Sequence, residues 1–136
     1  MKFFTKALAL AGSAAIAFAS FVPTASATGK THLTTQEQSA AADGLQYLSL
    51  MPFSRLGLIS QLSGPGGDGY SVHNATIGID SLTVNYKHEA VLDANSYIAL
   101  MPFSCSGLIG QLDGPGGDQY TVVQAAYGAD HSKDGC

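Results

Sequence analysis

The chain has 136 residues, of which 46% are hydrophobic and only 12% are charged, and its formal net charge is −4. This length and composition suit one small globular unit or two very small ones. The acidic balance argues against a nucleic-acid partner, because nucleic-acid binding relies on cations that displace counterions from phosphates.

The first 27 residues have the pattern of a secretory signal peptide. Lys2 and Lys6 precede an apolar, alanine-rich run over residues 7–22, and Ala25-Ser26-Ala27 has the A-x-A form of a cleavage site. The run is shorter than the roughly 20 residues that span a bilayer, which disfavours the alternative of a retained membrane helix. Cleavage after Ala27 would leave four cations against ten carboxylates, a net charge of about −6. No cysteine lies near the cut, so we expect a secreted or cell-surface protein without a lipid anchor or an integral membrane anchor.

The remaining chain contains a duplication with an offset of 50 residues. Residues 41–86 align with residues 91–136 without a gap, and about half of the paired positions are identical. The most similar stretches are MPFSRLGLISQLSGPGGDGYSV, which starts at Met51, and MPFSCSGLIGQLDGPGGDQYTV, which starts at Met101. Self-similarity at a fixed offset predicts a duplicated structural unit, here residues 28–84 and 85–136 after the signal peptide of residues 1–27.

Each unit is expected to form three helices. Residues that favour helix N-caps begin them: Thr34, Ser54, Ser71, Asn85, Ser104 and Thr121. Met51-Pro52 and the Gly-Pro-Gly-Gly run from Gly64 interrupt the first unit, and the second unit repeats both breaks. Apolar residues at helical spacing predict the buried faces, which include Leu45, Val72 and Val122. No stretch shows sustained period-two alternation, so we predict an all-α protein of two tandem three-helix, helix-turn-helix-like repeats.

The two cysteines, Cys105 and Cys136, are expected to form a disulfide. Export places them in an oxidising compartment, which favours a bridge over the alternative of a free nucleophilic Cys105. A bridge that closes this loop contributes roughly 3–4 kcal/mol in the chain-entropy model. The first unit has Arg55 and Tyr86 at the same positions, and Tyr86 leads into the next helix. We therefore hypothesise that the disulfide fastens the tail of the second unit in place of a following helix.

Four further residues are candidates for binding. Arg55 and Tyr86 are not retained in the second unit, so they are candidates for a contact that is unique to the first. Tyr70 and Tyr120 stand at helix entrances, where an aromatic side chain packs across the turn as a staple. If they are exposed, together with the phenylalanines of the MPFS stretches, they would instead form an aromatic binding patch.

Other sequence features give weak indications of chemistry. The GPGGD loops lack the lysine of a phosphate-binding loop, so we interpret them as helix–helix turns, with a calcium site at Asp113 and Asp118 as the alternative. The histidines are scattered, and we predict no metal and no cofactor. Asp80 and Asp130 lie near helix C-termini, where negative charge is unfavourable, so each should have a specific partner such as a backbone amide, or contact a ligand.

The repeat resembles that of the host cell surface-exposed lipoprotein family, often called Ltp-like. The stretches YLSLMPFSRLGLISQL, GYSVHNATIGID and VNYKHEAVLDANSYI match the family's repeat in order, and YIALMPFSCSGLIGQL and QYTVVQAAYGAD match it again. This chain departs from the family in three respects. It lacks the lipobox cysteine, it has Asn85-Tyr86 where the family has an Asp-Trp step, and its helix–helix link is lengthened by glycine and proline.

The resemblance implies tandem helical units at the bacterial surface or encoded by prophages, and some members of the family are associated with blocking DNA entry by a second phage. We therefore predict a secreted or cell-surface, non-enzymatic binding protein related to superinfection exclusion, whose acidic, tyrosine-bearing helix face does the binding. Its partner would be a protein, a cell-envelope component or a phage component, and not nucleic acid. The alternatives are a small secreted hydrolase and a helix-turn-helix DNA-binding protein.

Overall fold

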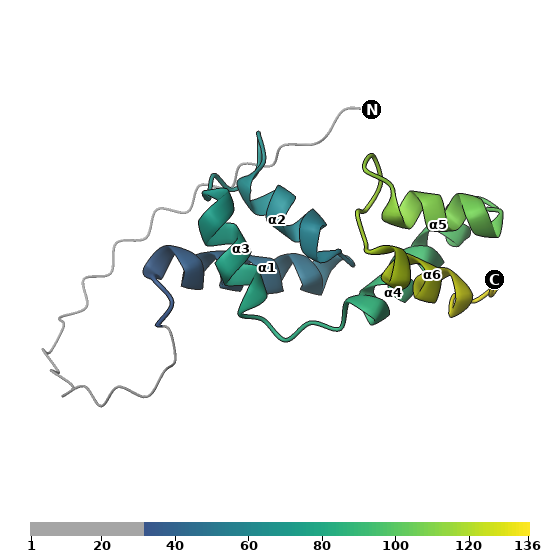
Figure 1. The fold of residues 1–136 in the computed structure, drawn as a ribbon, viewed down its shortest axis with the longest axis horizontal. Helices are drawn as coiled ribbons and strands as arrows, with labels where there is room; N and C mark the ends of the chain where they lie inside the picture. The colour runs from purple at the N-terminus through teal and green to yellow at the C-terminus, as the bar shows by residue number, and fades with distance from the viewer. Residues whose placement is uncertain (1–31) are drawn as a thin grey trace, which may run out of the picture. The chain divides into compact units, whose positions relative to one another are not determined.

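The computed structural model describes residues 32–136, so the predicted signal peptide lies outside the described residues. The described chain consists of six helices, shown in Figure 1: α1 (Thr35–Leu50), α2 (Arg55–Ser63), α3 (Val72–Asp80), α4 (Tyr86–Leu100), α5 (Cys105–Asp113) and α6 (Val122–Asp130). No strand occurs over residues 32–136, which confirms the all-α prediction of two tandem three-helix repeats. None of these helices combines the length and the apolar character needed to cross a membrane.

All six predicted N-cap residues cap a helix. The side chain of each accepts a hydrogen bond from the backbone N–H three residues later, as the sequence predicted. Thr34 and Glu37 form the predicted capping box, in which the Thr34 N–H donates to the Glu37 carboxylate over 2.7 Å. A second capping box joins Thr121 and Gln124 and was not predicted. Local sequence therefore determines where each helix begins.

Each repeat has its own small core, in which the third helix packs very closely on the first. The helix pairs α1–α3, α2–α3 and α1–α2 are in contact in the first repeat, and α4–α6, α5–α6 and α4–α5 in the second. A Cβ added at Gly78 would lie 2.7 Å from the carbonyl oxygen of Glu37, and one at Gly128 would lie 2.6 Å from that of Ala90. Only glycine permits this approach, and the equivalent alanines Ala40 and Ala90 are completely buried against it.

Three residues of the predicted buried stripes are exposed instead. Leu45, Val72 and Val122 retain more than half of their accessible surface. Helical spacing predicts which side of a helix faces the core, but not how far along that side the neighbouring helix extends. The covered part of α3 and α6 is the part around Ala75 and Ala125, which are both fully buried.

The GPGGD segments form turns, as predicted, but the two copies differ in backbone conformation. Gly66 and Gly69 have φ values of 84° and 81°, a region that favours glycine. In the second repeat Gln119, equivalent to Gly69, also has a positive φ, of 59°, whereas Gly116, equivalent to Gly66, does not. A side chain at such a φ is strained, and Gln119 lines the largest cavity described below.

Candidate functional site

The same group of acidic and aromatic side chains recurs in both repeats, where the first helix of the repeat meets its GPGGD loop. We call these groups the first acidic notch, formed by Asp43, Tyr47 and Asp68, and the second acidic notch, formed by Asp93, Tyr97 and Asp118. The first notch lines a cavity of about 210 Å³ together with Gln46 and Leu50. The duplication therefore produces two versions of one surface feature from identical residues.

Tyrosine hydroxyls hold both carboxylates of the first notch. The Tyr47 hydroxyl donates to Asp68 over 3.1 Å, and the Tyr70 hydroxyl donates to Asp43 over 2.6 Å. The amide of Gln61 in turn donates to the Tyr47 hydroxyl over 3.4 Å. The hydrogen bond to Asp43 and burial raise the pKa of Tyr70 to about 12, so its hydroxyl remains a donor at neutral pH.

The second notch contains the same residues but is less completely hydrogen-bonded. Gln111 donates to the Tyr97 hydroxyl over 3.2 Å, as in the first repeat. However, the Asp118 Oδ2 atom and the Tyr120 hydroxyl are buried without a hydrogen-bond partner among the described residues. A buried polar atom without a partner costs free energy, so the hydrogen-bonding groups of this notch are less well satisfied than those of the first.

The second notch opens into the largest of the cavities described, with a volume of about 600 Å³. Asp93, Tyr97 and Asp118 line it, and so does the segment from Met51 to Ser54 of the first repeat. The Ser54 hydroxyl, which caps α2, also donates to the backbone carbonyl of Asp118. This cavity is large enough for a side chain or a small molecule.

Burial raises the pKa of both carboxyl groups in the second notch, and for Asp93 the charge of Asp118 adds to it. Burial, and to a smaller extent the nearby charge of Asp118, raise the pKa of Asp93 to about 7. Burial also raises the pKa of Asp118. Tyr97 has its pKa raised to about 12, by burial and by its interaction with Asp118. At neutral pH Asp93 is therefore protonated in part of the molecules, and a bound cation would favour its ionised form.

The structure places the predicted binding residues mainly in contacts within the chain. Tyr70 holds Asp43, and Tyr120 is only 3% exposed in the core of the second repeat. Arg55 forms two hydrogen bonds with Asp80, of 2.5 and 2.7 Å. Tyr86, the first residue of α4, packs against the core of the first repeat. None of the four belongs to a notch itself, although Tyr70 holds one of the notch carboxylates.

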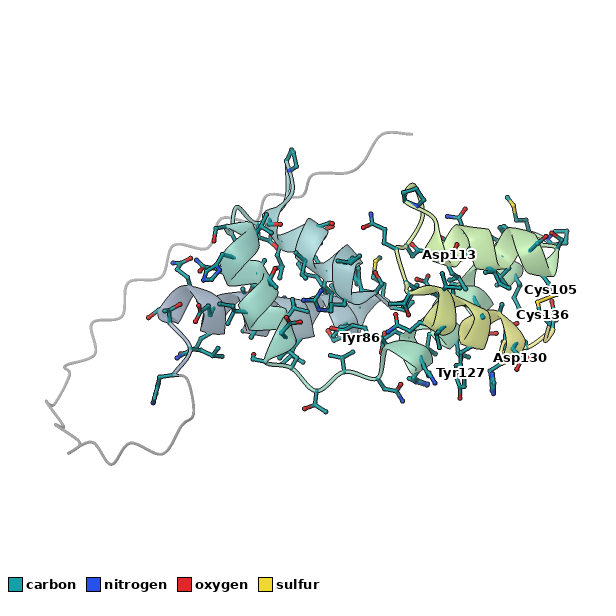
Figure 2. The ribbon with its side chains drawn as sticks, in the orientation of Figure 1. Tyr86, Cys105, Asp113, Tyr127, Asp130 and Cys136 are labelled. Atoms are coloured by element: carbon teal, nitrogen blue, oxygen red, sulfur yellow. A yellow bond between two sulfur atoms is a disulfide. The ribbon has the colours of Figure 1, made fainter. Side chains whose placement is uncertain are left out.

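Cys105 and Cys136 form the predicted disulfide, with their Cα atoms 5.5 Å apart (Figure 2). Asp80 has the specific partner that its position predicted, but this partner is the guanidinium of Arg55 and not a backbone amide. Arg55 lowers the pKa of Asp80, which keeps this carboxylate ionised. Asp130, the equivalent residue, lies 3.2 Å from the side chain of His131. The substitution of arginine by cysteine between the repeats thus replaces an ion pair with a covalent link.

The sequence contained a signal for the notches that our site prediction did not use. All three notch residues are identical between the two repeats, yet none was chosen as a binding residue. Asp118, considered above for calcium, belongs to the second notch. Among the described residues no three His, Cys, Asp or Glu side chains gather where they could hold a metal ion.

Comparison with known proteins gives the family. The sequence model of the host cell surface-exposed lipoproteins, Lipoprotein_Ltp, matches residues 35–82 and 85–131. Among solved structures, a similar fold occurs in Ltp, a superinfection exclusion protein from the Streptococcus thermophilus temperate phage TP-J34. The TM-score is 0.63 at 24% sequence identity, over 71% of this chain and 95% of that chain. No curated protein sequence matches the chain.

The two matched segments correspond to the two three-helix repeats, and together they cover more than half of the chain. Both the predicted resemblance and the predicted location at the cell surface are confirmed by this match. This chain belongs to the family of host cell surface-exposed lipoproteins.

Proposed function

We propose that this chain is a non-enzymatic binding protein of the cell surface that helps to exclude a second phage, and that its acidic notches contact the partner. The family and the similar fold of a superinfection exclusion protein support this role. The observation that carries the proposal is the presence of the same carboxylate–tyrosine group in both repeats. A pair of equivalent sites would allow one extended partner to bind at two places.

The chemistry of the notches indicates what they would bind. Their carboxylates accept hydrogen bonds and favour positive charge, and Asp93 and Asp118 both line the larger cavity. The tyrosines provide aromatic surface beside these acceptors. The partner is therefore a phage protein, or an envelope component that the phage uses, with exposed hydrogen-bond donors.

A plaque assay with matched charge variants tests this function. Bacteria that export the full chain should give fewer plaques of a sensitive phage than bacteria that do not. The isosteric double variant Asp68→Asn, Asp118→Asn should restore plaque formation by at least about tenfold, since each lost charged contact is worth roughly 1.5–3 kcal/mol. Asp134→Asn, an exposed residue outside both notches, removes one negative charge and should leave exclusion intact.

Two outcomes would overturn the proposal. Exported wild-type chain that leaves plaque formation unchanged for every phage tested would reject the exclusion role. Full exclusion by the notch variant, at equal surface abundance, would reject the notches as the contact site.

One observation favours a second function, that of a small secreted hydrolase. A carboxyl group with a pKa near 7, beside a second carboxylate in a cavity, is a typical arrangement for general acid–base catalysis. Purified chain should then cleave cell-wall glycan or peptide fragments, and Asp93→Asn should abolish the cleavage. Exclusion that survives Asp93→Asn would favour binding over hydrolysis.

A further inference from the structure

A second concave surface lies in the second repeat and shares no residue with the notches. It is an open groove of about 530 Å³, with a mainly apolar floor formed by Ile109 of α5 and by Ala126 and Tyr127 of α6. The disulfide and Asp130 form its rim. Figure 2 shows the disulfide, Asp130 and Tyr127 gathered at the C-terminal end of α6. We call this surface the α5–α6 groove.

In the first repeat, an aromatic side chain stands at the position equivalent to Cys136 and packs against the core. The residues equivalent to Cys105, Ile109, Asp130 and Cys136 are Arg55, Ile59, Asp80 and Tyr86. Tyr86 packs against the core cluster that contains Ile59. Burial raises the pKa of Tyr86, in agreement with this packing.

The difference in burial between the two repeats agrees with this comparison. Ile59 is only 7% exposed, whereas Ile109, at the same position, is only partly buried. In the second repeat the position of the tyrosine is Cys136, whose side chain is held in the disulfide. The groove beside Ile109 is lined by Tyr127 of α6, whereas the position equivalent to Tyr86 carries no aromatic ring.

We propose that the α5–α6 groove is a docking site for a tyrosine or tryptophan side chain that a partner protein presents at the first turn of a helix. The internal precedent is Tyr86, which stands at the first position of α4 and packs against the core of the first repeat. The floor of the groove supplies apolar contact for an aromatic ring, which contributes most of the energy at such anchors.

The polar rim of the groove selects tyrosine or tryptophan over phenylalanine. The Asp130 side chain is 66% exposed and interacts with His131, so it has oxygen lone pairs available to a phenol or indole donor. Lys87 lies 5.1 Å from the centre of the Tyr127 ring, where its cation can also contact an incoming ring.

A peptide taken from this chain tests the proposal. The probe is a blocked peptide of residues 83–94, which carries Tyr86 at the start of a helical segment. Titrated into the isotope-labelled protein, it should cause saturable NMR shifts at the amides of the α5–α6 groove. We expect a Kd on the order of 1 mM, because the peptide lacks the effective concentration of an attached helix. Peptides with Tyr86→Phe and Tyr86→Ala should bind progressively more weakly, and the Tyr86→Trp peptide should bind at least as well.

Matched protein variants locate the binding. Ala126→Trp fills the groove from an exposed position and should abolish the shifts, whereas Val122→Trp places the same side chain on α6 outside the groove lining and should leave them. Absence of saturable shifts, equal binding of the alanine peptide, or binding that survives Ala126→Trp would each overturn the proposal. The readout does not depend on phage exclusion, so the groove and the proposed function can fail separately.

Discussion

Asp43 and Asp93 occupy equivalent positions in the two repeats but have different surroundings. Asp43 accepts a short hydrogen bond from Tyr70. Asp93 lies in the larger cavity, where burial and the charge of Asp118 raise its pKa to about 7. The aspartate is therefore a hydrogen-bonded structural acceptor in the first repeat and a buried carboxyl group with a raised pKa in the second.

The raised pKa of Asp93 predicts how stability depends on pH. Between the ordinary aspartate pKa of 3.8 and about pH 7, the folded protein retains a proton that the unfolded chain has released, so stability falls as pH rises through this range. Asp93→Asn should flatten this decline and stabilise the protein at pH 7 by roughly 1–2 kcal/mol, after allowance for partial solvent screening.

Urea unfolding at a series of pH values from 4 to 8 measures this effect. Asp134→Asn is the control for the loss of one negative charge at an exposed position. A decline in stability that is equally steep in wild type and in Asp93→Asn would show that the raised pKa of Asp93 is not its cause.

At the scale of the helices, the two repeats fasten the start of their second helix in different ways. Arg55, the first residue of α2, is tied to Asp80, the last residue of α3, and both side chains are substantially exposed. Cys105, the first residue of α5, is instead linked to Cys136, beyond the end of α6. An exposed ion pair is worth at most about 1 kcal/mol, whereas the disulfide also restricts the unfolded chain.

Removal of each link should therefore have unequal effects. The double variant Cys105→Ser, Cys136→Ser should lose about 3 kcal/mol of unfolding free energy and on the order of 10 °C in Tm. Arg55→Ala should lose about 1 kcal/mol or less. Calorimetry of the oxidised protein and both variants makes the comparison, and an unchanged Tm in the serine variant would refute the stabilising role of the disulfide.

At the scale of the whole molecule, each repeat packs largely on itself. All of the closely packed helix pairs lie within one repeat or the other. The repeats also contact each other at individual residues, for example through the hydrogen bond from Ser54 to Asp118 and the packing of Tyr86 against the first core. Damage to the core of one repeat should therefore remain mostly within that repeat.

A substitution at Gly128 tests this independence. Gly128→Ala places a Cβ against the backbone of α4 and should cost about 2 kcal/mol. Amide hydrogen exchange should then accelerate in α4–α6 but stay unchanged in α1–α3. Equal acceleration in both repeats of the Gly128→Ala variant would show that the repeats unfold as one unit.

Gly110→Ala is the control at a glycine that has free space around the new Cβ. It should stabilise α5 by up to about 1 kcal/mol.

The sequence alone determined the helices, their caps, the duplication and the disulfide. These features depend on residues that are close in the chain, or on a pattern that repeats along it. Thr34 caps α1 because of Glu37 three residues later, and this needs no knowledge of the fold.

The tertiary structure alone decided which distant side chains meet. Asp43 and Tyr70 are 27 positions apart, and Arg55 and Asp80 are 25 apart, so no local rule could pair them. Packing also decided that Val72 is exposed, since only the neighbouring helix sets how much of a face is covered. Each acidic notch forms where a helix meets a loop distant in the sequence, and the α5–α6 groove forms where α5, α6 and the disulfide meet, so both are properties of the folded chain and not of any one segment.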